Sequence, residues 1–147
     1  MSAASWPQLL RRSCSPDAIT ILRSTVAMWR AEFATRALGL RTACRWLGVR
    51  HPGESALASG RPVPSAVHQQ TQHRVTWALR LSGLPDTCLR RALVAGYLTQ
   101  EYRPTLRIGV RSRNPFEAHA WLEYGGVAYE PGNSNSPEPL TELRGLK

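Results

Sequence analysis

The pattern of hydrophobic residues changes at Pro104, and this change constrains the fold more than any other feature of the chain. Before that residue, apolar side chains recur every three or four positions, which is the period of amphipathic helices. After it, the segment TLRIGVR alternates strictly between apolar and polar residues, as a half-buried strand does. Helices therefore come first and strands last. This segregation predicts an α+β protein rather than a doubly wound fold.

Four helices are expected before Pro104. The first runs from an N-cap at Ser15 to a stop at Gly39, and the others cover residues 40–48, 65–83 and 84–100. The first helix is expected to bury one apolar face, whose members recur at three- and four-residue steps: Ile19, Leu22, Val26, Trp29 and Phe33. Between the second and third helices, residues 49–64 hold three prolines and two glycines and are predicted to form a loop.

A two-residue hairpin is predicted at Gly125-Gly126, between the segments EAHAWLEY and VAYE. In this register Tyr124 pairs with Val127, and Trp121 pairs with Glu130. The face expected to be core carries Ala118, Ala120, Leu122, Val127 and Tyr129. The less apolar face carries His119, Trp121 and Glu130. The residues after 131, rich in Asn, Ser and Pro, are expected to form a loop or tail.

Composition indicates one domain of 147 residues, with residues 1–63 as an N-terminal helical region and loop and residues 64–147 as the core. The net charge of +9 favours acidic partners. Three cysteines without a CxxC spacing argue against a disulfide framework, and four scattered histidines argue against a zinc site. The sequence shows neither an apolar run long enough to span a membrane nor a secretory signal, so a cytoplasmic protein is expected.

Cys88 falls in the first turn of the fourth predicted helix, which Asp86 or Thr87 would cap. The free N–H groups and the dipole at a helix start favour a thiolate. The same N–H groups can donate hydrogen bonds to an oxyanion that forms on an attacked carbonyl. Arg90 and Arg91 would add positive charge nearby. The alternative is that Cys88 only fills space beneath the helix.

His119 lies in a predicted strand, between two alanines. A strand that crosses the start of the helix would bring its imidazole to the Cys88 thiol, as a base is brought to a cysteine nucleophile. Glu130 lies on the diagonal of His119, and diagonal positions are about 7–8 Å apart. Its carboxylate would therefore orient the imidazole. Taken singly, a half-exposed strand histidine and a surface glutamate explain the two positions well; together with Cys88 they make a candidate triad.

Two segments, DTCLRRALVAGYL and LRIGVRSRNPFEAHAWLEYGGVAYE, resemble the transglutaminase-like cysteine protease domain of bacterial lasso-peptide B proteins, the microcin-maturation proteases. The resemblance covers residues 84–130. It implies a papain-like core with Cys88 as nucleophile, His119 as general base and acid, and an acidic third member. The family has aspartate at that third place, whereas no aspartate follows Asp86 here. Glu130 is the nearest substitute, with Asn133 and Asn135 as alternatives.

The resemblance also implies a function in the maturation of a ribosomally made peptide. Such a protease removes the leader of a lasso-peptide precursor before a companion synthetase closes the macrolactam ring. The chain is expected to be the stand-alone protease, working with a separate leader-binding protein and without a metal or nucleotide cofactor.

Three other functions remain open from the residues alone. The first is a basic nucleic-acid-binding module, which rests only on the +9 charge. The sequence shows neither a recognition helix nor an aromatic platform, so no nucleic acid is expected as a partner. The second is a transglutaminase-like acyltransferase that uses an amine instead of water. The third is a scaffold that has lost activity.

Overall fold

A computed structural model describes residues 16–51, 60–111, 117–129 and 141–142 of the chain. Its helical elements come first: α2 (Pro16–Phe33), a π-helical segment η1 (Ala34–Leu38), α3 (Leu40–Trp46), α4 (Ser65–Ser82) and α5 (Cys88–Leu98). A short 3-10 turn η2 (Gln100–Tyr102) leads to the strands β1 (Thr105–Arg111), β2 (Glu117–Tyr124), β3 (Val127–Tyr129) and β4 (Thr141–Glu142). The α+β class is confirmed.

The strands form one sheet in the order β3-β2-β1-β4, with antiparallel neighbours. The predicted hairpin is confirmed, because Tyr124 pairs with Val127 across Gly125 and Gly126, whose φ angles are 55° and 83°. Positive φ at both central residues is what such a turn requires. Strand β4 was not expected, since it lies in the segment predicted as loop or tail; two residues are too few to show an alternating pattern.

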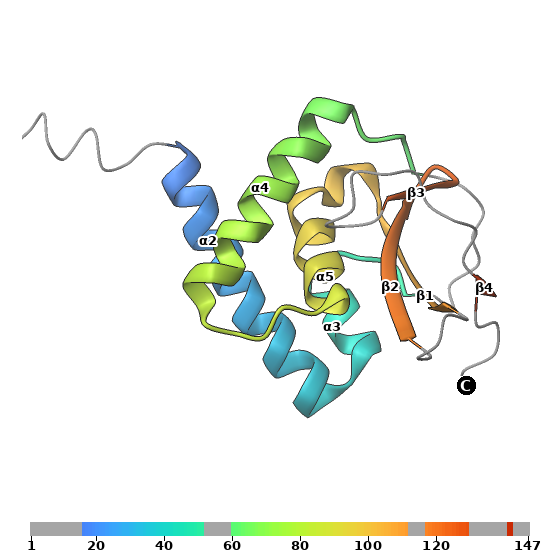
Figure 1. Ribbon diagram of the computed structural model, residues 1–147, viewed down its shortest axis with the longest axis horizontal. Coiled ribbons are helices and arrows are strands. Elements are labelled where there is room, and N and C mark those ends of the chain that lie inside the picture. Colours follow the sequence, from blue (N-terminus) through green and yellow to red (C-terminus); the bar gives the residue numbers. More distant parts are fainter. Residues whose placement is uncertain (1–15, 52–59, 112–116, 130–140, 143–147) are drawn as a thin grey trace, which may run out of the picture.

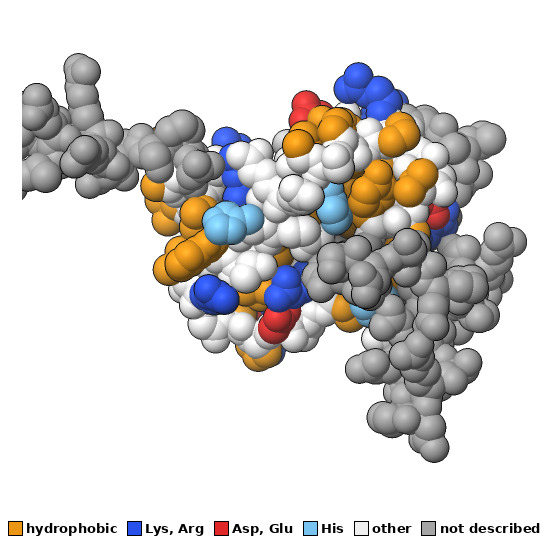
Figure 2. Space-filling model, turned by 45° about the horizontal axis from the view of Figure 1, so that its top comes forward, with side chains coloured by type: hydrophobic (Ala, Val, Ile, Leu, Met, Phe, Trp, Pro, Cys, Tyr) orange, Lys and Arg blue, Asp and Glu red, His pale blue; other side chains and the backbone are white. Residues whose placement is uncertain are grey.

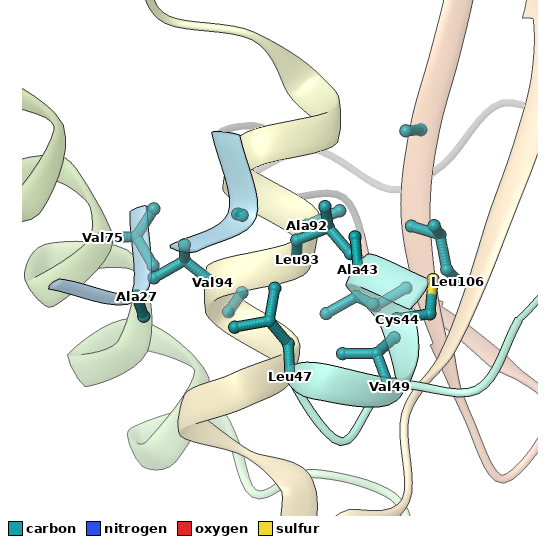
Figure 3. Close-up of a cluster of buried hydrophobic side chains, with 14 of the residues drawn as sticks. Ala27, Ala43, Cys44, Leu47, Val49, Val75, Ala92, Leu93, Val94 and Leu106 are labelled. Atoms are coloured by element: carbon teal, nitrogen blue, oxygen red, sulfur yellow. The ribbon is translucent and has the colours of Figure 1, made fainter. Parts of the chain in front are cut away.

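Helix α5 is the central element of the fold. In Figure 1 it lies between the helices α2 and α4 on one side and the strands β1 and β2 on the other. Its buried side chains contact both layers, and Figure 3 shows Leu93 and Val94 among core residues from α2, α3, α4 and β1. Helix α3 buries Ala43 and Cys44, and Cys44 packs there as a small hydrophobe. Helix α4 buries Thr71, Val75, Ala78 and Leu79.

The prediction for α2 is wrong about which face is buried. All five residues of its expected core face are exposed: Ile19, Leu22, Val26, Trp29 and Phe33. The buried face instead carries mostly small side chains: Ser24, Ala27, Met28, Ala31 and Glu32. Helix α2 packs against both α4 and α5, and small side chains let helices approach closely. The large apolar side chains therefore point away from the core.

In β2, the alternation between the two faces of the sheet agrees with the prediction at its centre. Ala120, Leu122 and Tyr124 are buried and belong to the core. The prediction is wrong at the ends of the hairpin, where Ala118 and Val127 are exposed.

Candidate active site

The start of α5 is a capped helix N-terminus. Thr87 is the N-cap, in an extended conformation, and its Oγ1 accepts a hydrogen bond of 3.3 Å from the backbone N–H of Arg90. Cys88 is the first helical residue, and its side chain is partly exposed. Since the cap uses the N–H of Arg90, the earlier N–H groups of Cys88 and Leu89 are the helix-start donors that this cap does not use.

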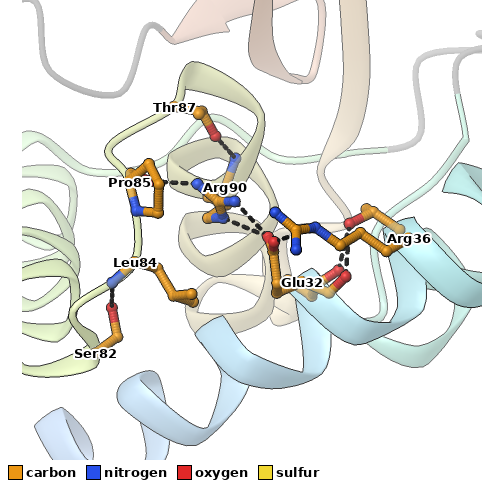
Figure 4. Close-up of polar contacts among 9 residues, drawn as sticks. Glu32, Arg36, Ser82, Leu84, Pro85, Thr87 and Arg90 are labelled. Carbon is orange, nitrogen blue, oxygen red and sulfur yellow. Dashed lines mark hydrogen bonds and ion pairs between the residues drawn. The ribbon is translucent and has the colours of Figure 1, made fainter.

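Two ion pairs hold the arginines that follow Cys88. Arg91 donates hydrogen bonds of 2.6 Å from Nε and from Nη2 to the two carboxylate oxygens of Asp86. These bonds lower the pKa of Asp86 below its ordinary value. Arg90 donates from Nε to Glu32 of α2 at 2.6 Å and from Nη1 to the Pro85 carbonyl (Figure 4).

These contacts change the predicted electrostatics of the site. Both arginines were expected to add positive charge near Cys88, but each is compensated by a carboxylate. The two arginines therefore add less positive charge than expected, and the helix N-terminus remains a source of positive potential beside Cys88. Sequence reasoning also missed Glu32, which anchors the first turn of α5 to α2. Its partner lies 58 positions away, and no local pattern in the sequence connects them.

His119 lies on β2, directly opposite Gly109 of β1. Its ring stacks on that of Trp121, with centroids 6.3 Å apart and 14° between the planes. Trp121 is only 6% exposed. Gly109 therefore brings no side chain of its own against the imidazole, and the Trp121 indole covers one side of the ring.

The rise per residue puts Cys88 and His119 at about the same distance from the contact that joins α5 to β2. Figure 1 shows that α5 and β2 run in the same direction, and at their far ends Thr99 Oγ1 lies 2.7 Å from the Tyr124 hydroxyl. Cys88 precedes Thr99 by 11 residues; at 1.5 Å of rise per helical residue, that is about 16 Å. His119 precedes Tyr124 by five residues, which is also about 16 Å along a strand.

Side chains along β2 point alternately to the two faces of the sheet. Alternation along β2 puts His119 on the face opposite to Leu122, which packs beside Gly96 of α5. Ala118, the next residue toward the strand start, is exposed, so the layer is open at this end. The described residues form no hydrogen bond between Cys88 and His119. The proposed third members, Glu130, Asn133 and Asn135, lie outside the described residues.

A second polar cluster lies at the opposite end of α5. The Tyr124 hydroxyl meets Thr99, the Tyr129 hydroxyl donates to the Val63 carbonyl at 3.1 Å, and these residues line a small cavity with His68. Burial raises the pKa of Tyr124 to about 12 and lowers the pKa of His68. The cluster joins α4, α5 and the hairpin far from Cys88, so we assign it a structural role.

The chain matches the family model of the Transglutaminase-like superfamily over residues 18–144, and it therefore belongs to that superfamily. The match takes in the N-terminal helices as well as the sheet. Members of this superfamily are typically cysteine proteases or acyltransferases. No curated protein and no solved structure gives a significant match to the chain.

The described residues show neither a metal centre nor a membrane-spanning helix. No group of three or more His, Cys, Asp or Glu side chains there is placed to hold a metal ion. None of the helices that the structure describes is both long enough and apolar enough to cross a bilayer.

Proposed function

We propose that the protein is a cysteine peptidase that removes the leader from a lasso-peptide precursor. Cys88 is the nucleophile, His119 the general base and acid, and Glu130 the group that orients the imidazole. One observation carries the proposal: in a chain of the transglutaminase-like superfamily, a partly exposed cysteine is the first residue of a capped helix. The resemblance around CLRRAL and FEAHAW supports the narrower substrate class.

In the proposed reaction, His119 takes the thiol proton and the Cys88 sulfur attacks the carbonyl carbon at the end of the leader. The N–H of Cys88 donates to the oxyanion that forms. The peptide C–N bond then breaks, His119 protonates the amine of the departing core peptide, and the leader remains as a thioester. Water, deprotonated by His119, hydrolyses the thioester and restores the thiol.

Partners and location follow from the same proposal. The substrate is the precursor peptide, presented by a separate leader-binding protein in the cytoplasm, and a synthetase then closes the macrolactam on the new N-terminus. Residues 64–147 form the protease core in this scheme, and the helices before it support that core. The positive charge of the chain, +9, suits an acidic leader or an acidic presenting protein.

The decisive experiment is to incubate the protein with a lasso precursor and its leader-binding protein and to weigh the products by mass spectrometry. Cys88→Ala and His119→Ala should each lower the cleavage rate by at least about a hundredfold. His73→Ala, at an exposed histidine of α4, is the matched control and should cleave normally. Glu130→Gln should reduce the rate less than either. Cleavage that persists in Cys88→Ala would refute the proposal.

Acyl transfer to an amine is the second candidate, because the same thioester would serve it. Adding a labelled primary amine to the reaction separates the two activities. A protease gives the free leader acid as the main product, whereas an acyltransferase gives the leader amide. If neither product forms and Cys88 is not labelled by iodoacetamide, the chain is an inactive scaffold; buried Cys44 is the internal control for that labelling.

A further inference from the structure

Helix α2 presents a row of large apolar side chains to solvent. The exposed fractions are 51% for Ile19, 65% for Leu22, 52% for Val26, 54% for Trp29 and 59% for Phe33. Figure 2 shows one face of the molecule, on which hydrophobic and arginine side chains lie next to one another. Five such residues on one helix are more than scattered surface exposure explains, and a contiguous exposed patch marks an interaction site.

The spacing within this row is that of a coiled-coil seam. Its five members follow one another at steps of three, four, three and four residues, so they occupy the a and d positions of a heptad. The opposite side of the helix is already used, because Ala27, Met28 and Ala31 are buried in the core. A strict a and d stripe is narrower than the apolar face of a helix that lies in a membrane surface. The seam therefore fits a second helix better than it fits a lipid surface.

The positions beside the seam determine which helix would fit. Arg23 and Arg30 both fall at e positions and are exposed. The g positions hold Ala18, Thr25 and Glu32, and the Glu32 carboxylate is bound by Arg90 and Arg36. The exposed flank of the seam is therefore positive. Charges at e and g positions set partner choice in coiled coils, so this flank selects glutamate or aspartate on the partner.

A second copy of the chain does not supply those acids. In an antiparallel pair of α2 helices, e positions face e positions, which would place the exposed Arg23 and Arg30 against arginines. In a parallel pair, e positions face g positions, which would place them against Ala18 or Thr25. Neither arrangement gives an ion pair.

We propose that α2 is a docking site for an amphipathic helix of a partner protein, one that carries an apolar seam flanked by acidic residues. The seam residues pack against the partner's a and d side chains, and Arg23 and Arg30 pair with its acids. This inference concerns a surface other than the candidate active site, and it holds whether or not the chain is a peptidase.

Two synthetic helical peptides of four heptads test the proposal, both with Leu at a and d. One carries Glu at every e and g position and the other carries Lys, so that like charges keep each peptide from pairing with itself. Binding of the labelled peptides to the full chain is measured by fluorescence anisotropy. The Glu peptide should bind about tenfold or more tightly than the Lys peptide, since two arginines distinguish them.

Matched variants locate the binding on α2. Leu22→Ser should weaken Glu-peptide binding at least about tenfold, whereas Leu81→Ser, at an α4 leucine exposed to 61% against 65% for Leu22, should leave it unchanged. The double change Arg23→Glu with Arg30→Glu should reverse the preference between the peptides. Because these side chains are exposed, circular dichroism should show that every variant is folded.

Each remaining outcome overturns the proposal. Equal binding of both peptides would show that the flank does not select acids. Failure of both peptides, together with a dimer that Leu22→Ser dissociates in analytical ultracentrifugation, would make a second copy the occupant. Failure of both, together with Leu22-dependent binding to phosphatidylglycerol vesicles, would make it an anionic membrane. Failure of all four tests would show that the seam docks nothing of this kind.

Discussion

The ion pair between Glu32 and Arg90 leads to the sharpest prediction about stability. Glu32 is 8% exposed, and its carboxylate, between α2 and α5, accepts a hydrogen bond from Arg90 Nε at 2.6 Å. It also contacts Arg90 Nη2 and Arg36 Nε, each at 2.5 Å (Figure 4). Glu32→Gln keeps the shape of the side chain and removes its charge. The Arg90 guanidinium, with its side chain 11% exposed, then loses its carboxylate partner.

Removing one partner of a buried ion pair costs about 3–5 kcal/mol, because a charge is left without compensation. The glutamine oxygen still accepts one hydrogen bond, so the expected loss here is about 2–4 kcal/mol. For a chain of this size, that lowers the melting temperature by about 6–12 °C. The matched control is Arg36→Ala. Its side chain contacts the same carboxylate but is 75% exposed, so the cost should stay below about 1 kcal/mol.

Urea denaturation followed by circular dichroism measures the stability of both variants. If the dependence of the unfolding free energy on urea concentration is the same for both, the difference between their denaturation midpoints gives the difference in stability. The double variant Glu32→Met with Arg90→Met should be more stable than Glu32→Gln, because it leaves no buried charge. If Glu32→Gln costs no more than Arg36→Ala, the ion pair does not anchor the start of α5, and the explanation given for the buried glutamate is wrong.

Three further predictions concern α5 and the residues that pack against it. The folded pKa of Tyr124, about 12, lies above its unfolded value of about 10. The stability that the neutral phenol contributes is therefore intact below pH 10 and is lost as pH rises toward 12. Tyr124→Phe should remove about 2–3 kcal/mol of this loss of stability at alkaline pH, measured by urea denaturation between pH 9 and 12. In Gly96→Ala, the added Cβ would lie 2.5 Å from Val49 Cγ2. Thermal unfolding should therefore show a loss of about 1–3 kcal/mol in stability. An unchanged melting temperature would mean that the neighbouring side chain moves aside at no cost. Thr87→Ala removes the cap on the Arg90 N–H, so stability should fall by about 1 kcal/mol with faster amide exchange at that residue, and exchange equal to wild type would show that the cap does not protect it.

Much of the fold was predictable because local chemistry decides it. The glycine pair at residues 125 and 126 demands a tight turn, and that turn sets the register of β2 with β3. The start of α5 was predictable in the same way, since Thr87 is a good N-cap and a helical apolar pattern follows it. The position of Cys88 at a helix N-terminus therefore needed no tertiary information. Strand β4 has two residues and could not be predicted from a periodic pattern.

The candidate site was predictable only in part. The chain segments that hold Cys88 and His119 were recognisable in the sequence. How far each residue lies along the α5–β2 pair depends on the packing of α5 against β2, through contacts such as that between Thr99 and Tyr124. The compensation of Arg90 also required the fold, because Glu32 comes from a distant helix. Such contacts depend on packing, which leaves no mark in the local sequence.

Taken by itself, the sequence determined the order of the elements, the hairpin and the helix start at Cys88, since these depend on residues close together in the chain. Only the tertiary structure decided which side of α2 is buried. Periodicity identified an apolar face at Leu22 and Trp29, but α4 and α5 cover the face with Ala27 and Ala31, whose small side chains let helices approach closely. Burial was therefore decided by how closely α4 and α5 approach α2, and the more hydrophobic face was left open to solvent.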